Sequence, residues 1–228
     1  MREDFRALPG TPYIIRDSDQ ISWYSQIMDR LARVVAPGVP HHVTQRGNRR
    51  QRTFFCDDDY KAYIELMAEW CSRCGVAIWA FCLMPNHVHL IVVPGSEAGL
   101  RGAIGEAHRR YSRRINYREG WRGHLWQGPF ASYPMNEPYL FAAVRYVELN
   151  AVRARLVRSP GEYPWSRAAA HLTGRDDELV KVAPPLAMAP NWVTFLSAEC
   201  SDTGSEALLR HERTGRPLGD DDFITLLE

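Results

Sequence analysis

The sequence predicts an α+β protein in which helices pack on a central, mostly antiparallel sheet, followed by a helical C-terminal appendage. The predicted elements run in the order strand, helix, strand, strand, helix, strand, helix. Two apolar runs, at 76–83 and 87–93, are joined by a turn of only a few residues. Strands this close in sequence pair antiparallel, because a parallel pair needs a crossover of about a dozen residues or more.

The first half of the chain supplies a strand, a helix and this hairpin. Residues 41–46 are predicted as a strand that stops at Gly47 and Asn48. Asp57–Asp59 have the composition of a helix N-terminus, and apolar side chains then recur every three or four residues until Gly75. Residues 84–86 form the hairpin turn, since the proline at 85 does not fit inside a central strand.

The second half adds helices around a short strand. Residues 98–118 carry an apolar stripe at helical spacing, with arginine at many of the remaining positions, and 130–133 is strand-like. A further helix is predicted from Asn136 to about Leu149, with Pro138 near its first turn. A shorter helix is predicted to begin near Trp165.

The pattern is weaker at both ends of the chain. We assign residues 1–27 to an N-terminal extension, 28–174 to the main domain, and 175–228 to a linker and a small, acidic helical tail. Pro184, Pro185 and Pro190 mark the linker.

Charge is unevenly distributed, although the net charge is only +1. Seven arginines and two glutamates lie between Arg101 and Arg122, whereas three arginines and eight acidic residues follow from Glu199 onward. Clustered arginine is the electrostatic footprint of a protein that binds a phosphate backbone. A solvated helix face gives the same pattern, so charge alone leaves both interpretations open.

The cysteines and the hydropathy exclude several classes of protein. The five cysteines, an odd number, argue against a disulfide framework, and the lone CxxC at Cys71 and Cys74 lacks the second pair of ligands that structural zinc needs. No run approaches the roughly 18 apolar residues of a membrane span, and the first residues lack the apolar segment of a signal peptide. We therefore expect a cytoplasmic protein that has no membrane partner.

His87 and His89 stand two residues apart on the predicted strand 87–93. Strand alternation places both imidazoles on one face, roughly 7 Å apart, and sends Val88 and Leu90 to the other. Two histidines on an apolar strand require partners, because unpaired polar groups are costly to bury. Such a pair alone is more often two hydrogen-bonded or half-exposed histidines than a metal site, and a third ligand has to come from elsewhere.

Tyr146 and Asn150 lie four residues apart on the predicted helix and share a face. An asparagine carbonyl oxygen suits a hard ion such as Mg²⁺ or Mn²⁺, and a His/His/Asn set leaves positions open for phosphate oxygens. A tyrosine hydroxyl, whose ordinary pKa is about 10, can attack a phosphate that a divalent ion polarises. On spacing alone, a packed helix tyrosine is the commoner explanation of Tyr146.

These pieces are joined by a resemblance to a known family. Met84-Pro85-Asn86-His87-Val88-His89-Leu90-Ile91 closely resembles the HUH signature of single-tyrosine transposases of the IS200/IS605 type. More narrowly, the chain resembles the REP-associated tyrosine transposases of bacteria. The resemblance continues through His42–Asn48, Leu125–Gly128, Tyr146–Ala154 and Tyr163–Ser166, and covers about residues 30–172. Each motif alone is only moderately specific, but together, in the right order, they are strong.

The resemblance implies a ferredoxin-like HUH endonuclease fold whose sheet carries the histidines. It implies Tyr146 as the nucleophile, His87, His89 and Asn150 as ligands of Mg²⁺ or Mn²⁺, and single-stranded DNA hairpins (REP-like palindromes) as the substrate. Family members cleave beside imperfect palindromes, form a 5′-phosphotyrosine link and leave a free 3′-hydroxyl. The resemblance further implies a bacterial, nucleoid-associated protein that works as a monomer or a homodimer.

Three positions depart from the family pattern. Family members often have Asn-Pro where this chain has Asn150-Ala151, Ala-Gly where it has Ala154-Arg155, and arginine in place of Pro129. None of the three touches the implied ligands or nucleophile, although Pro129 removes a possible phosphate contact.

DNA contacts are predicted from charge and position. We expect phosphate contacts from the turn after strand 41–46 and from the polar face of helix 98–118, and base contacts from the Trp-Gln-Gly passage. The residues assigned to DNA are Arg46, Asn48, Arg49, Arg52, Arg109, Arg110, Arg113, Arg114, Trp126 and Gln127. For Trp126, a buried anchor of an irregular loop is about as good an explanation.

Three functions compete. The first is a transposase-type nuclease and strand transferase. The second is a domesticated relative that holds hairpin DNA or RNA without cutting it, and the intact set of four site residues argues against this. The third is an unrelated metal hydrolase that activates water, which would form no protein-linked DNA and would tolerate loss of Tyr146.

Overall fold

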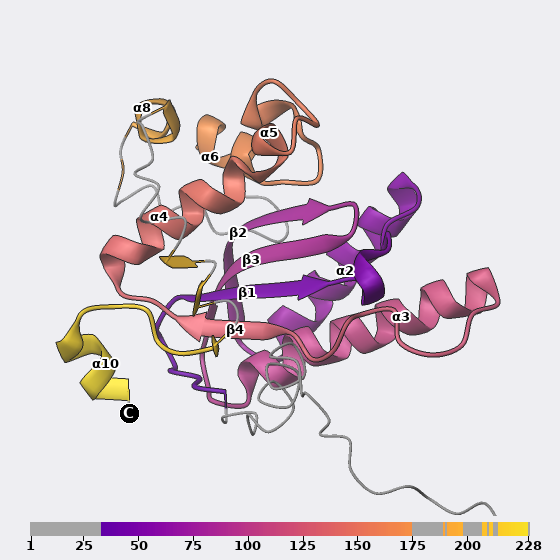
Figure 1. Ribbon diagram of the computed structural model, residues 1–228, viewed down its shortest axis with the longest axis horizontal. Coiled ribbons are helices and arrows are strands. Elements are labelled where there is room, and N and C mark those ends of the chain that lie inside the picture. The colour runs from indigo at the N-terminus through magenta and orange to yellow at the C-terminus, as the bar shows by residue number, and fades with distance from the viewer. Residues whose placement is uncertain are drawn as a thin grey trace, which may run out of the picture. The chain divides into compact units, whose positions relative to one another are not determined.

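The computed structural model (Figure 1) describes residues 33–174, 189, 191–197, 207–208, 210–211 and 214–227. The predicted N-terminal extension, 1–27, and most of the predicted linker lie outside the described residues. The three-part division of the chain therefore stays a prediction.

Four antiparallel strands form the sheet, in the spatial order β2-β3-β1-β4. Their bounds are β1 His41–Arg46, β2 Val76–Met84, β3 His87–Pro94 and β4 Ala131–Pro134. Helix α2 (Asp57–Arg73) connects β1 to β2, and helix α3 (Glu106–Glu119) connects β3 to β4. The resulting order β-α-β-β-α-β is the ferredoxin-like arrangement, and the predicted α+β fold class is confirmed.

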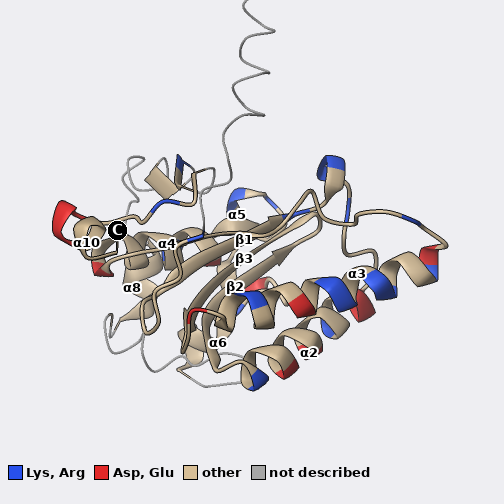
Figure 2. Cartoon of the chain, turned by 90° about the horizontal axis from the view of Figure 1, so that it is seen from below, with Lys and Arg blue, Asp and Glu red and all other residues tan. Residues whose placement is uncertain are grey.

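The two connecting helices cover the same face of the sheet. Val88 and Leu90 of β3 are buried in a core that α2 and α3 share. Figure 2 shows these two helices side by side on one side of the sheet, with α4 (Glu137–Glu148) on the other side. Ile91 belongs to the core on the α4 side. Strand alternation therefore sends the odd-numbered residues of β3, including both histidines, to the face that α4 crosses.

The hairpin and the helix starts follow the local signals in the sequence. Met84 pairs with His87 across the two-residue turn, and this sets the register that places Cys82 opposite His89. Helix α4 begins after Asn136, with Pro138 in its first turn. It ends at Glu148, and the four-residue helix α5 (Asn150–Arg153) follows Leu149 directly.

Two predicted helices differ from the observed ones. A π-helical turn, η2 (Arg101–Gly105), precedes α3, and a Cβ on Gly102 would lie only 2.9 Å from the Cys74 sulfur, so this turn packs closely on the end of α2. The helix predicted near Trp165 begins at Ala168 instead (α6, Ala168–Thr173). The reason is that the backbone at 165–167 hydrogen-bonds to β2, with Leu83 N–H donating to the Trp165 carbonyl at 2.8 Å.

Short elements complete the described chain: η1 (Asn48–Arg50), η3 (Pro160–Glu162), α8 (Trp192–Ser197) and α10 (Asp221–Leu227). Trp192, Leu196, Leu208 and Leu218 are buried in the core on the α4 side. The described parts of the C-terminal segment thus contribute to the core between the sheet and α4. Among the described helices, none has the length and apolar character needed to cross a membrane.

Candidate catalytic site between the sheet and α4

The two histidines lie together on β3 at the end of the sheet where the hairpin turns. Their ring centroids are 5.0 Å apart and the rings are nearly perpendicular, so both project from one face as predicted. His89 is buried, with 2% of its surface exposed, and His87 is half-buried. The neighbouring strand β1 places Thr44 beside His89 and Arg46 beside His87.

Hydrogen bonds around His87 determine which of its nitrogens carries the proton. The amide nitrogen of Asn86 donates to the Arg50 carbonyl at 3.0 Å, which turns the amide oxygen toward His87. His87 Nδ1 lies 2.7 Å from that oxygen. Because this oxygen can only accept, Nδ1 is the protonated nitrogen, and the Nε2 lone pair is left for a ligand.

His89 contacts a third histidine, His42 of β1. Nε2 of His42 lies 3.1 Å from Nδ1 of His89, and Nδ1 of His42 lies 2.7 Å from the Tyr133 hydroxyl. Burial lowers the pKa of His42 to about 3 and holds the pKa of His89 well below its usual range. Burial, with the nearby Arg46 charge, lowers the pKa of His87 to about 4. All three rings are therefore neutral at pH 7, the form in which imidazole binds metals.

Tyr146 lies on α4 against these rings. Its ring centroid is 5.5 Å from that of His89 and 6.3 Å from that of His42, with edge contacts in both cases. The Arg153 guanidinium lies 4.0 Å from the centroid of the Tyr146 ring and donates a hydrogen bond to the Tyr146 carbonyl. The tyrosine thus lies between a histidine that can bind a metal and a fixed positive charge.

Asn150 begins α5, one residue after the break at Leu149, and is 8% exposed. The next residue, Ala151, is buried in the same core as Cys82, and Cys82 is paired with His89 across β2 and β3. Helix α5 thus packs against β2, the strand next to the one that carries the histidines.

His87, His89 and Asn150 would together offer three donors to a divalent ion. In the part of the chain that the structure describes, no group of three or more His, Cys, Asp and Glu side chains could hold a metal. A site at His87 and His89 therefore needs a third donor of another type, and the Asn150 amide oxygen is such a donor. The amide oxygen is a donor that suits Mg²⁺ or Mn²⁺, whereas neutral imidazole is a ligand typical of transition-metal ions.

The loop after β1 brings most of its predicted DNA contacts to this end of the sheet. Gly47 N–H donates to the Asn86 carbonyl at 2.8 Å, next to His87, and Gln127 N–H donates to the Arg46 carbonyl at 2.9 Å. Arg49 has a left-handed backbone, with φ of 52°, a conformation that costs an ordinary residue on the order of 1–2 kcal/mol and recurs at functional sites. The predicted contacts gathered here are Arg46, Asn48, Arg49, Arg52 and Gln127.

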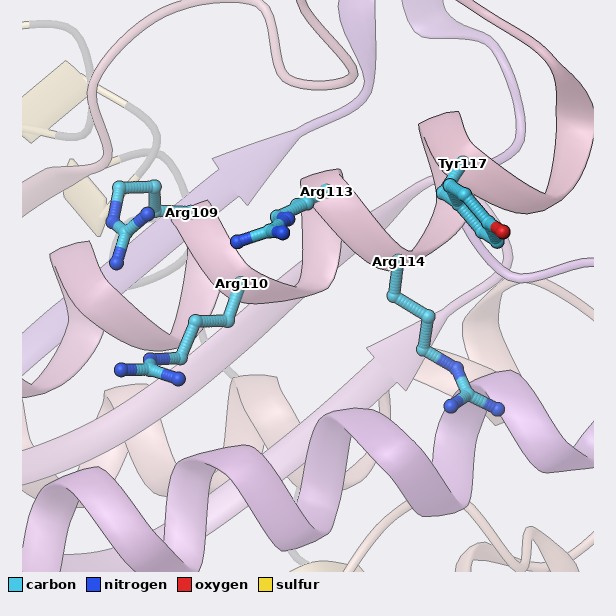
Figure 3. Close-up of a pocket in the computed structure, with 5 residues that line it drawn as sticks. All are labelled: Arg109, Arg110, Arg113, Arg114 and Tyr117. Atoms are coloured by element: carbon cyan, nitrogen blue, oxygen red, sulfur yellow. The ribbon is translucent and has the colours of Figure 1, made fainter.

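The remaining predicted DNA contacts lie elsewhere. Four of them lie along α3, on the opposite face of the sheet: Arg109, Arg110, Arg113 and Arg114. Together with Tyr117 they line a pocket of about 470 Å³ (Figure 3). Trp126 is buried in the core beside α3, at 6% exposure, and its indole N–H points to the His108 carbonyl. This burial is what a loop anchor would show, and the predicted base contact of Trp126 stays a prediction.

Sequence reasoning missed His42, Tyr133 and Arg153. Arg153 follows Tyr146 by seven residues, a helical spacing that could have indicated their contact. His42 and Arg46 lie on the same face of β1. No local signal shows that His42 reaches His89, because that contact depends on the register between strands.

The structure also accounts for one departure from the family pattern. Arg155 has φ of 58°, in the left-handed region that glycine enters without strain. Glycine, which family members often have at this position, is the residue that this backbone conformation favours.

Comparison with known proteins identifies the family and the fold of this chain. Residues 38–150 match the family model "Transposase IS200 like". A solved REP-associated tyrosine transposase, bound to a REP hairpin, has a TM-score of 0.52 and 19% identity over 68% of this chain and 93% of that one. At this identity the likeness shows the fold alone. A putative transposase from Deinococcus radiodurans has a TM-score of 0.37 and 16% identity over 56% of this chain and 92% of that one. No curated protein matches the chain. Through its domain at residues 38–150, this chain belongs to the IS200-like transposase family.

Proposed function

We propose that this protein is a metal-dependent single-stranded DNA endonuclease and strand transferase that acts at palindromic hairpins through a 5′-phosphotyrosine intermediate. The observation that carries the proposal is the position of Tyr146, whose ring packs against His89 on one side and the Arg153 guanidinium on another. Membership of a transposase family supports the same class of chemistry.

The proposed reaction is a transesterification. The Tyr146 hydroxyl oxygen attacks the scissile phosphorus, so that a tyrosine–phosphorus bond forms and the bond to the 3′-oxygen breaks. The phenol loses a proton and the departing 3′-oxygen gains one. The number of phosphoester bonds is unchanged, so neither water nor ATP is consumed, and attack by a 3′-hydroxyl reverses the step.

The chain's own residues supply the nucleophile, the ligands and the charge. His87, His89 and Asn150 would hold Mg²⁺ or Mn²⁺, which when bound polarises the phosphate oxygens. Arg153 stabilises negative charge at the Tyr146 hydroxyl and at the phosphate, and Arg46, beside His87 in the sheet, provides a second cation for the strand.

Two basic surfaces support the proposed substrate class. The surface around the β1 loop adjoins the site, whereas the α3 surface, Arg109, Arg110, Arg113 and Arg114, lies on the other face. Hydrogen bonds link α3 to the hairpin turn: the Tyr111 hydroxyl donates to the Thr53 carbonyl at 2.7 Å, and Thr53 N–H donates to the Pro85 carbonyl at 2.9 Å. A hairpin with a single-stranded flank can therefore contact α3 with one part and reach His87 with the other.

The proposal is tested with the full chain and single-stranded DNA that carries the imperfect palindromes flanking its gene. With Mg²⁺ or Mn²⁺, we expect a protein–DNA adduct on a denaturing gel and a free 3′-hydroxyl that a polymerase can extend. Tight binding without an adduct in either ion would favour the non-cleaving binder. Cleavage without protein-linked DNA would favour the water-activating hydrolase.

Arg153→Ala is expected to slow cleavage of bound DNA by about 100-fold, the typical cost of removing one preorganised charge or donor at a transition state. Arg153→Lys retains the positive charge and should recover part of the rate. Single-turnover rates on saturated DNA measure the effect. Arg158→Ala, an exposed arginine five residues later, is the control that should leave the rate unchanged; equal rates for Arg153→Ala and wild type would remove Arg153 from the mechanism.

The double variant Arg113→Ala/Arg114→Ala is expected to weaken hairpin binding and to flatten its dependence on salt. Each phosphate contact that is lost reduces the slope of log K against log salt by about 1. Neither arginine has an acidic partner among the described residues, so both charges are free to meet phosphate. Fluorescence anisotropy at several salt concentrations gives the slope. Arg73→Ala, on the neighbouring helix and paired with Glu69 at 2.9 Å, is the matched control; an unchanged slope in the double variant would exclude α3 from the DNA surface.

A further inference from the structure

We infer that His42 and Tyr133 are positioning residues that fix the tautomer of the ligand His89, through a hydrogen-bond chain that begins at the Leu208 carbonyl in the C-terminal segment. The inference deepens the proposed function and rests on it for the role of His89 as a ligand. It assigns a part in the site to a segment that lies beyond the matched family domain.

The direction of each hydrogen bond follows from what its partners can donate. The Tyr133 hydroxyl donates to the Leu208 carbonyl at 3.1 Å, which uses its only proton. It must therefore accept from His42 Nδ1, which lies at 2.7 Å and is the protonated nitrogen of that ring.

The same reasoning continues from His42 to His89. With its one proton on Nδ1, neutral His42 presents a lone pair at Nε2, and His89 Nδ1–H donates to it at 3.1 Å. The proton of neutral His89 is thereby placed on Nδ1, and its Nε2 is left with a lone pair for a metal ion. Metal-binding histidines commonly have such a partner on the second nitrogen, which fixes both tautomer and ring orientation.

Burial makes this arrangement rigid. Tyr133 is fully buried, and His42 and His89 are 1% and 2% exposed, so water does not compete for these bonds. The ring centroids of His42 and His89 are 5.3 Å apart and the rings are nearly parallel, while Tyr133 meets His42 edge-on at 5.3 Å. His87 reaches the same tautomer through Asn86, so both histidines present Nε2.

The first test needs neither metal nor DNA. Long-range ¹H–¹⁵N NMR of the metal-free full chain reports which nitrogen of His89 carries the proton. We expect protonated Nδ1 in wild type. We expect a loss of this preference in His42→Leu, which removes the acceptor, and retention in His42→Gln, whose amide oxygen can take the place of Nε2. A wild-type His89 protonated on Nε2 would overturn the inference, whatever the outcome of the cleavage assay.

The second test measures Mn²⁺ affinity of the free protein by the EPR signal of unbound Mn²⁺. His42→Leu should weaken binding about 10- to 100-fold, as loss of the outer partner of a ligand does elsewhere. Tyr133→Phe should weaken Mn²⁺ binding less. His42 then keeps its ring but loses the hydroxyl group that holds its proton on Nδ1. His42→Gln should stay close to wild type.

The chain offers a matched control on the other face of the sheet. His108 of α3 is also buried and lies 2.8 Å from the Tyr63 hydroxyl of α2, on the face of the sheet away from the site. His108→Gln should lower thermal stability and leave both the His89 tautomer and the Mn²⁺ affinity unchanged. Folded His42→Leu protein with wild-type Mn²⁺ affinity would overturn the positioning role. Mn²⁺ binding without any DNA cleavage would instead count against the proposed function alone.

Discussion

Tyr146→Phe is expected to abolish the covalent protein–DNA adduct while hairpin binding stays close to that of wild type. The substitution removes only the hydroxyl oxygen that attacks phosphorus. The phenyl ring retains its contacts with His89 and with the Arg153 guanidinium, so the local packing should persist.

The measurement pairs a denaturing gel for the adduct with anisotropy for binding, at one Mg²⁺ or Mn²⁺ concentration. Tyr139→Phe, a half-buried tyrosine seven residues earlier on α4, is the matched control and should form adduct at the wild-type level. An adduct that persists in Tyr146→Phe and disappears in another tyrosine variant would move the nucleophile elsewhere. DNA cleavage that continues without any adduct would point to water as the nucleophile.

Local signals in the sequence were sufficient for the elements that carry the site. The strand 41–46 is observed as predicted, and the hairpin around Pro85 and Asn86 differs from the prediction by one residue at most. Both depend on alternation and turn chemistry within a few residues. The shared face of His87 and His89 follows from the same alternation, so the prediction that they project together is confirmed.

What the sequence could not supply depends on contacts between distant segments. The register of β1 against β3 decides that Arg46 lies beside His87, and the fold decides that α3 packs on the opposite face from the histidines. A charge pattern shows that α3 is basic, but not which face of the sheet it covers. The end of α4 at Glu148 agrees with the helix predicted to about Leu149, but the sequence does not show that a second helix, α5, starts at Asn150.

The buried carboxyl group of Glu148 links the end of α4, which carries Tyr146, to two other helices. Glu148 is fully buried, and its two oxygens have separate partners: Nδ1 of His171 on α6, and the indole N–H of Trp192 on α8 at 2.7 Å. Glu148 stands two residues after Tyr146 and two before Asn150. Glu148, which hydrogen-bonds α4 to two other helices, therefore lies between the proposed nucleophile Tyr146 and the proposed ligand Asn150.

Glu148→Ala is expected to destabilise the fold by about 2–6 kcal/mol, because it leaves two buried donors, on His171 and Trp192, unsatisfied at about 1–3 kcal/mol each. The cost is high because the partners cannot turn to water. In the described part of the chain, Nε2 of His171 already lacks a hydrogen-bond partner, so loss of Glu148 leaves both nitrogens of this buried ring unpaired. Urea unfolding followed by circular dichroism measures the change, and Glu65→Gln, at an exposed position of α2, should stay within about 0.5 kcal/mol of wild type.

Glu148→Gln separates stability from catalysis. The amide keeps the shape of the side chain and can still accept from Trp192, so we expect a smaller loss of stability than in Glu148→Ala. If the hydrogen bonds of Glu148 position Tyr146 and Asn150, the adduct rate should fall in both variants, even at temperatures where each variant is fully folded. A folded Glu148→Ala protein that forms adduct at the wild-type rate would show that the hydrogen bonds of Glu148 only stabilise the fold. Asn150 would then keep its position without them.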